Sequence, residues 1–274
     1  MHKKRISRII LCLAILGLIG YISWRYYQTP RSVATTEKKE QQPAEIRHII
    51  QINEIEEIAS YVTPGPETLV IFDLDNTVIW PEEPEARDEW FAGQLSAYKK
   101  VGLTPDEAIK RFLPTHLKAH ATSKIYNVDK DTPWLFTFLK ENNVRVIALT
   151  ARSIAFIGIT KKQLKKADIK FSPGKNGWNE YYEIDGLKKP IFYTNGIIFA
   201  GGNPKGPTLE LFLQKLAFKP KELIFVDDSR QHVESVAETA KKIGIEKYFC
   251  FWFTKMDTSG ADKPISLQPA PTIA

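Results

Sequence analysis

Two aspartates spaced two residues apart follow an apolar run in the segment VIFDLDNTVI, residues 70–79. Asp73 and Asp75 stand where their neighbours are of the buried type. Carboxylates can attack a substrate as nucleophiles, transfer protons, or bind a hard cation such as Mg²⁺. The structural alternative is a turn, because Asp and Asn also favour the turns that follow strands. One such pair alone therefore predicts no function.

Polar residues also follow two other apolar runs. Thr150 comes directly after residues 144–149, VRVIAL, and Asp227 with Asp228 comes after residues 222–226, ELIFV. The carboxyl ends of parallel strands meet at one edge of a sheet, where ligands bind. We therefore expect these side chains and the first two aspartates to converge on one crevice. A helix cap is the structural alternative for Thr150 and for the two adjacent acids.

Four segments, DLDNT, ALTAR, GGNPKG and FVDDS, resemble in this order the four motifs of the haloacid dehalogenase superfamily, over about residues 67–252. The most specific is D-x-D-x-T directly after an apolar strand. The resemblance implies a Mg²⁺-dependent hydrolase of small phosphomonoesters that acts through an aspartyl-phosphate. Two alternatives stay open: transfer of the phosphoryl group to an alcohol acceptor, and a catalytically idle binding or scaffold protein of the cell envelope with the same fold.

The resemblance also implies a role for each acid. Asp73 would be the nucleophile and Asp75 the general acid and base. Mg²⁺ would be bound by Asp73, by the backbone carbonyl of Asp75 and by the acids at 227–228. By the family's alignment Asp228 binds the metal directly and Asp227 lies beside it, although the sequence alone does not separate two adjacent residues at a strand end.

The other motif residues would bind the substrate. Thr150 and Ala151 would bind the phosphoryl oxygens through the hydroxyl group and neighbouring backbone N–H groups. Lys205 would offset the clustered carboxylates and hold the nucleophile in place; a surface lysine in a Gly-rich loop is the alternative. His232 stands four residues past Asp228, where relatives often carry another acid, and this departure leaves a fourth carboxylate near the metal open.

The elements that must position these residues follow from the apolar pattern. Residues 68–72, 144–149 and 222–226 are too short for free helices and too continuously apolar for half-exposed strands, so they are predicted as buried parallel strands. Helical stretches alternate with them: TPWLFTFLKENN, PTLELFLQKLAF and HVESVAETAKKIG. The alternation predicts an α/β fold, a three-layer, Rossmann-like parallel sheet flanked by helices.

Two segments lie outside this alternation. Residues 80–128 have helical spacing and fall after the first motif strand, where the superfamily places a small helical cap that excludes water and selects the leaving group. Its aromatic residues, including Trp80, Trp90 and Phe91, favour packing over substrate stacking. Residues 171–203 contain Asn195-Gly196 between apolar runs, a hairpin signal. We expect this hairpin to extend the sheet rather than to form a second lid.

The N-terminus carries the excess charge. Residues 1–31 hold six basic side chains and no acid, so the rest of the chain has 32 basic and 32 acidic residues, which predicts no nucleic-acid partner. The basic cluster precedes an uncharged apolar run, Ile9 to Trp24, typical of an export signal or membrane anchor. We expect an uncleaved anchor that holds the protein on the periplasmic or outer side of the membrane; cleavage near Ala34, which would release it, is the alternative.

The predicted organisation has four parts: a signal or anchor at residues 1–28, a linker at 29–45, a domain of the haloacid dehalogenase type at 46–254, and a flexible tail at 255–274. The linker is polar and contains two prolines. The tail is polar and rich in proline.

Overall fold

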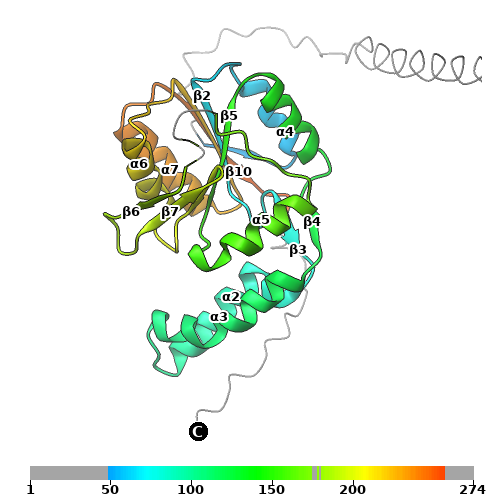
Figure 1. Ribbon diagram of the computed structural model, residues 1–274, viewed down its shortest axis with the longest axis vertical. Helices are drawn as coiled ribbons and strands as arrows, with labels where there is room; N and C mark the ends of the chain where they lie inside the picture. The colour runs from blue at the N-terminus through cyan, green and yellow to red at the C-terminus, as the bar shows by residue number, and fades with distance from the viewer. Residues whose placement is uncertain (1–48, 175–177, 179, 257–274) are drawn as a thin grey trace, which may run out of the picture. The chain divides into compact units, whose positions relative to one another are not determined.

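The computed structural model describes residues 49–174, 178 and 180–256 (Figure 1). Within them, one sheet has the strand order β1-β10-β9-β2-β5-β8-β7-β6. Its strands are β1 (Ile49–Ile52), β2 (Thr68–Phe72), β5 (Arg145–Thr150), β6 (Tyr182–Ile184), β7 (Ile191–Thr194), β8 (Ile197–Phe199), β9 (Glu222–Asp227) and β10 (Lys247–Phe253). All neighbours from β1 to β8 pair in parallel, and β7 pairs antiparallel with β8 and β6. The predicted fold class is confirmed.

Helices cover both faces of this sheet. They are α4 (Thr132–Glu141), α5 (Ile157–Lys166), α6 (Lys205–Lys215) and α7 (Arg230–Lys242), with the short 3₁₀ turns η1 (Ile55–Tyr61) and η3 (Ile154–Phe156). Helices α6 and α7 lie on one face, and α4 with η1 on the other (Figure 1). The predicted helices over α4, α6 and α7 are confirmed.

Strand β2 shows why three layers form. All five of its residues are buried, and successive side chains point to opposite faces of a sheet. Val70 and Phe72 join the core under α4, whereas Leu69 and Ile71 join the core under α6 and α7. A strand that is apolar on both faces requires a helical layer on each side.

The segment between β2 and α4, which we call the cap after the prediction for residues 80–128, is largely helical. It consists of β3 (Ile79–Pro81), η2 (Pro84–Ala86), α2 (Asp88–Lys100), α3 (Pro105–Thr122) and β4 (Ile125–Asn127). Helix α3 begins at a capping box, in which Thr104 and Glu107 bond to each other's backbone N–H, and Pro105 follows the cap. The two helices enclose their own core of Trp90, Tyr98, Ala108 and Phe112. The antiparallel pairing of β3 with β4, which joins the cap to the domain, was not predicted from the sequence.

The predicted hairpin extends the sheet. Asn195 and Gly196 both have positive φ, 52° and 79°, between β7 and β8. A Cβ on Gly196 would lie 2.9 Å from the Cβ of Phe171, so the turn requires glycine there. Strand β8 then pairs with β5 and leads through a short loop to the start of α6.

The ends of the chain carry the remaining predictions. The apolar run from Ile9 to Trp24, the linker and the tail beyond residue 256 lie outside the described residues. Among the residues that the structure describes, no helix combines the length and the apolar character needed to cross a membrane.

Candidate active site

The polar residues that follow the three central strands meet at one edge of the sheet. Asp73 follows β2, Thr150 ends β5 and Asp227 ends β9, and β2 lies between β5 and β9. Asp73, Asp227 and Asp228 each offer a carboxylate oxygen, and these atoms lie within 4.8 Å of one another. Parallel strands thus bring together acids that are more than 150 residues apart in the sequence.

Lys205 lies between two of these acids. Its Nζ atom donates to Oδ1 of Asp73 at 2.5 Å and to Oδ2 of Asp227 at 2.6 Å, and only 1% of its side chain is exposed. Burial opposes its charge, but Asp227 and Asp73 raise the pKa of Lys205 above its ordinary value. A lysine at this position is therefore a fixed positive charge.

Close packing of two helices sets the position of Lys205. It begins α6, and the next residue, Gly206, lies against α7. A Cβ on Gly206 would lie 2.3 Å from the carbonyl oxygen of Ser235, so a larger residue would push α6 away. The backbone N–H of Gly206 donates to the Ser235 hydroxyl.

The two adjacent acids at the end of β9 have different surroundings. Asp227 already has partners for both oxygens: Lys205 at Oδ2, and at Oδ1 the backbone N–H of Ser229, 2.8 Å away, and Nδ1 of His232, 3.2 Å away. Burial would raise its pKa, but Lys205 and His232 hold the pKa of Asp227 below the usual range. Among the described residues, no lysine forms an ion pair with Asp228. Its side chain has a hydrogen bond with the Asn76 side chain, and its backbone N–H donates to the Thr77 hydroxyl at 3.1 Å.

Negative charge is in excess at this site. Burial, together with Asp73 and Asp227, raises the pKa of Asp228 to about 8. Burial also raises the pKa of Asp73 to about 7, although the charge of Lys205 opposes this shift. Three carboxylates share one lysine, so the arrangement favours either a proton or a further cation.

Asp75 pairs with Arg152 rather than with Lys205. Its oxygens accept from Nε of Arg152 at 2.8 Å and from Nη2 at 2.7 Å, a two-bond ion pair in which both side chains are largely buried. Burial alone would raise its pKa, but the charge and hydrogen bonds of Arg152 lower the pKa of Asp75 below the ordinary value. The structure thus brings the two motif aspartates to the same edge but gives them separate partners.

Sequence reasoning missed Arg152. The residue follows Thr150 and Ala151 in the ALTAR segment, and its backbone N–H donates to the Thr150 hydroxyl at 3.2 Å. Thr150 is buried and Ala151 is exposed. The one available signal was position, because Arg152 stands beside two predicted substrate-binding residues.

The cap contributes a further acid near the site. Asp88 is the first residue of α2 and its side chain is exposed. Loss of hydration next to the surrounding protein raises the pKa of Asp88 well above its ordinary value, and the negative charges of nearby acids raise it further. The largest of these charge effects come from Asp75, Asp73 and Asp228. The start of α2 is therefore close enough to the site to respond to its charge.

The cap aromatics pack as predicted. Trp90 is buried in the cap core and Phe91 packs against it. The ring of Trp80 lies beside Tyr126 and under the guanidinium of Arg87, 4.3 Å from the ring centroid.

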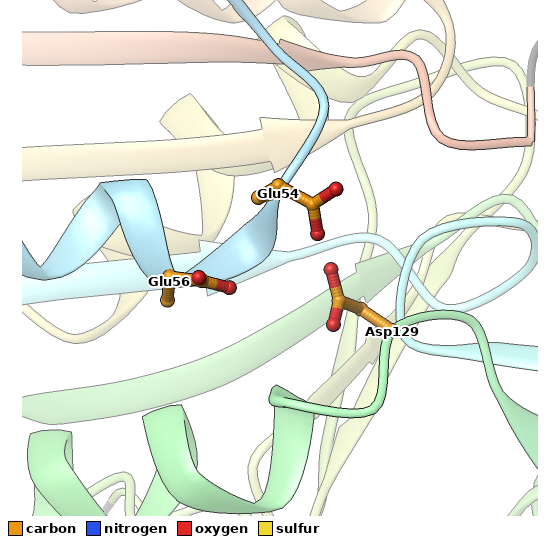
Figure 2. Close-up of side chains that lie close together, drawn as sticks. All are labelled: Glu54, Glu56 and Asp129. Atoms are coloured by element: carbon orange, nitrogen blue, oxygen red, sulfur yellow. The ribbon is translucent and has the colours of Figure 1, made fainter.

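The side chains of a second acidic group, Glu54, Glu56 and Asp129, lie close together (Figure 2). Nζ of Lys255 pairs with Oε2 of Glu54 at 2.6 Å and with Oδ2 of Asp129 at 2.9 Å. Asp129 also accepts from the backbone N–H groups of Ile55 and Asp131. Lys255 stands at the start of the predicted flexible tail, yet its ion pairs with Glu54 and Asp129 connect this residue to the folded domain.

Known proteins resemble this chain over most of its length. A family model described as "Protein of unknown function (DUF2608)" matches residues 51–270. A protein of Chlamydia trachomatis named "Putative outer membrane protein" is 26% identical over 73% of this chain and 74% of its own length. A protein of the same description from Chlamydia pneumoniae is 23% identical over 71% of this chain and 73% of its own length.

Two solved structures are also similar. A haloacid dehalogenase-like hydrolase from Streptococcus pneumoniae is 12% identical over 70% of this chain and 97% of its own, with a TM-score of 0.43. An enzyme of the same superfamily from Bacteroides thetaiotaomicron, in complex with magnesium and inorganic phosphate, is 16% identical over 68% of this chain and 94% of its own, with a TM-score of 0.38.

Proposed function

The chain belongs to the DUF2608 family, and we propose that it is a Mg²⁺-dependent phosphomonoester hydrolase that acts through an aspartyl-phosphate on Asp73. The observation that carries the proposal is the group formed by the buried Asp73 and Asp227 and the partly buried Asp228 around a single lysine. Holding three such carboxylates close to one ammonium group is costly unless the site also binds a cation. The D-x-D-x-T motif and the order of the strand-end residues support the same activity.

The donor set fits Mg²⁺. The ion prefers oxygen ligands at about 2.1 Å in octahedral geometry, so neighbouring ligand atoms lie about 3–4 Å apart. Asp73 and Asp228 offer such oxygens within 4.8 Å of each other. Within the described residues, the turn after β2 uses the carbonyls of Leu74 and Ile79 as acceptors, and the carbonyl of Asp75 would be available to a metal. Both oxygens of Asp227 already have hydrogen-bond partners, which favours Asp228 as the direct ligand.

Each residue then has a distinct role. When bound, Mg²⁺ would screen the charge of the phosphoryl group. An Asp73 oxygen attacks phosphorus as the bond to the leaving oxygen breaks. Asp75, which must first take up a proton from solvent because Arg152 favours its ionised form, gives that oxygen the proton. Asp75 then takes a proton from water, whose oxygen attacks phosphorus and releases phosphate from Asp73. Thr150 and Ala151 bind the phosphoryl oxygens from the end of β5.

Two conservative variants test the separate roles of Asp73 as nucleophile and Asp75 as general acid and base. Asp73→Asn should abolish turnover and aspartyl-phosphate formation, because an amide oxygen is a poor nucleophile and a weaker metal ligand. Asp75→Asn should retain Mg²⁺ binding and lose proton transfer, a contribution typically of about 10²–10⁴ in rate. The loss should be larger for an alkyl phosphate than for nitrophenyl phosphate, whose leaving group departs with little help from an acid. The exposed Asp185→Asn is the matched control.

Equal losses on both esters, or normal turnover by Asp73→Asn, would contradict the proposal. The substrate class itself requires a screen of small phosphorylated compounds with the wild-type chain. Adding an alcohol to the same reactions separates hydrolysis from transfer, because transfer yields a new phosphate ester in place of free phosphate.

We also propose that the protein works in the cell envelope, held to the membrane through its N-terminus. The support is the basic cluster before the apolar run from Ile9 to Trp24, together with the names of the chlamydial relatives. A reporter fused after residue 46 should be exported and remain with membranes. Recovery in the soluble periplasmic fraction would instead indicate cleavage near Ala34, and cytoplasmic recovery would contradict export.

A further inference from the structure

Every N–H group of the Arg152 guanidinium has an acceptor. Nε and Nη2 donate to the two oxygens of Asp75. Nη1 donates to Oγ1 of Thr160 at 2.8 Å and to Oε1 of Gln163 at 2.7 Å. The remaining Nη2 hydrogen faces Nδ1 of His120, and the Nη2 and Nδ1 atoms are 3.4 Å apart. A guanidinium has five donors, so all of them are used and its plane has a single orientation.

This arrangement fixes the carboxylate of Asp75. In the part of the chain that the structure describes, both of its side-chain oxygens bond to Arg152 alone. Only 5% of the Arg152 side chain and 13% of the Asp75 side chain are exposed. A planar fork that makes two parallel bonds sets the plane of the carboxylate, which a lysine ammonium would not do.

The same group of hydrogen bonds includes the cap. His120 belongs to the last turn of α3 and is 2% exposed. Its Nδ1 faces Arg152 and also Nε2 of Gln163 at 3.3 Å, and its carbonyl oxygen accepts from the same Nε2 at 2.8 Å. Burial and the charge of Arg152 lower the pKa of His120 to about 3, so the ring is neutral. Both groups that face Nδ1 are N–H donors, so Nδ1 is the acceptor.

We propose that Arg152 is a positioning residue that holds the Asp75 carboxylate in place for proton transfer, and that His120 ties this arrangement to the cap. The inference rests on the proposed function. Arg152 does not itself need to touch the substrate, because its donors are already occupied. Its contribution lies in orientation, where a displacement of about 1 Å can cost about 10²-fold in rate.

The test is Arg152→Lys, which keeps the positive charge and removes the fork. We expect turnover of an alkyl phosphate to fall about 10²-fold and turnover of nitrophenyl phosphate to fall much less. Arg152→Lys added to Asp75→Asn should cause no further loss, because two residues that act as one unit are not additive. Arg145→Lys is the matched control, since Arg145 begins the strand that Arg152 follows and bonds to the carbonyls of Pro66 and Pro173.

If Arg152 served only the stability of the fold, its variants would give different results. Equal losses on both esters, or a full additional loss in the Asp75→Asn background, would overturn the proposal. Denaturant unfolding of each variant, with Arg145→Lys for comparison, shows whether a loss reflects folding. The link to the cap is tested by His120→Ala, which should show a smaller deficit that is again larger for the alkyl ester; equal deficits would overturn that link.

A crystal structure of Arg152→Lys separates this inference from the proposed function. If the wild-type chain hydrolyses neither ester, the proposed function fails, yet the Asp75 carboxylate of the variant should still leave its wild-type orientation. An unchanged carboxylate would overturn the positioning role whatever the activity.

Discussion

Asp228→Asn should change the stability of the protein in opposite directions with and without Mg²⁺. The structure places the Asp228 carboxylate within 4.8 Å of the carboxylates of Asp73 and Asp227. At an effective dielectric constant of about 20, like charges at that separation repel by about 3 kcal/mol per pair. Lys205 offsets about one of the two repulsions, and the partial exposure of Asp228 weakens the remainder. Without metal, the amide should therefore raise the free energy of unfolding by about 2 kcal/mol at about pH 9.

The pH dependence has a definite sign. The folded protein raises the pKa of Asp228 to about 8. An acid whose pKa rises on folding destabilises the fold where it is ionised, so the cost begins above about pH 4 and is complete above about pH 8. The advantage of Asp228→Asn should accordingly shrink as the pH falls from about 9 towards 4.

Mg²⁺ should reverse the order of stability of the wild-type chain and Asp228→Asn. A ligand that binds only the folded state at about 100 times its Kd stabilises that state by about 2.7 kcal/mol. The wild-type chain should gain this stability and Asp228→Asn should gain little. Urea unfolding with chelator and with excess Mg²⁺ measures both effects, with Asp185→Asn as the control. A destabilised Asp228→Asn in chelator at high pH, or equal Mg²⁺ stabilisation of both proteins, would refute the reasoning.

Two further predictions concern lysines that pair with buried acids. Lys205→Met should lower the free energy of unfolding by about 3–5 kcal/mol, because it leaves Asp73 and Asp227 buried without their counter-ion; urea unfolding measures the loss, and wild-type stability would contradict it. Lys255→Met should cost about 1–2 kcal/mol, because Lys255 is partly exposed but pairs with the fully buried Asp129. That loss should be absent in an Asp129→Asn background, which the same unfolding measurements check.

The sequence predicted the central strands because their signal is local. Residues 68–72, 144–149 and 222–226 are mostly apolar, and each run is followed by a polar residue that helped to mark its end. The edge strand β1 was missed because its sequence, IIQI, is only four residues long and too short to show a pattern. Strand β10 was missed although KYFCFWF is almost wholly apolar, because it carries no motif residue at its end.

Other features of the site depend on contacts between distant segments. Asp227 and Asp228 are equivalent in the sequence, and the approach of Lys205 to Asp227, together with the contacts of Ser229 and His232, distinguishes the pair. The partners of Arg152 lie 8, 11, 32 and 77 residues away along the chain. An arginine beside a loop is ordinarily a surface residue, so no local pattern predicts its burial.

Two buried cations divide the site into two parts with different chemistry. Lys205 is a compact charge that two carboxylates share, which suits a nucleophile that must remain ionised beside a metal. Arg152 is a planar fork bound to one carboxylate, which suits a group that must keep its orientation while it gains and loses a proton. Exchanging the two cation types should therefore harm both parts. An ammonium would leave Asp75 free to rotate, and a guanidinium is bulkier than the ammonium of Lys205, which is 1% exposed and lies 2.5 and 2.6 Å from its two carboxylates.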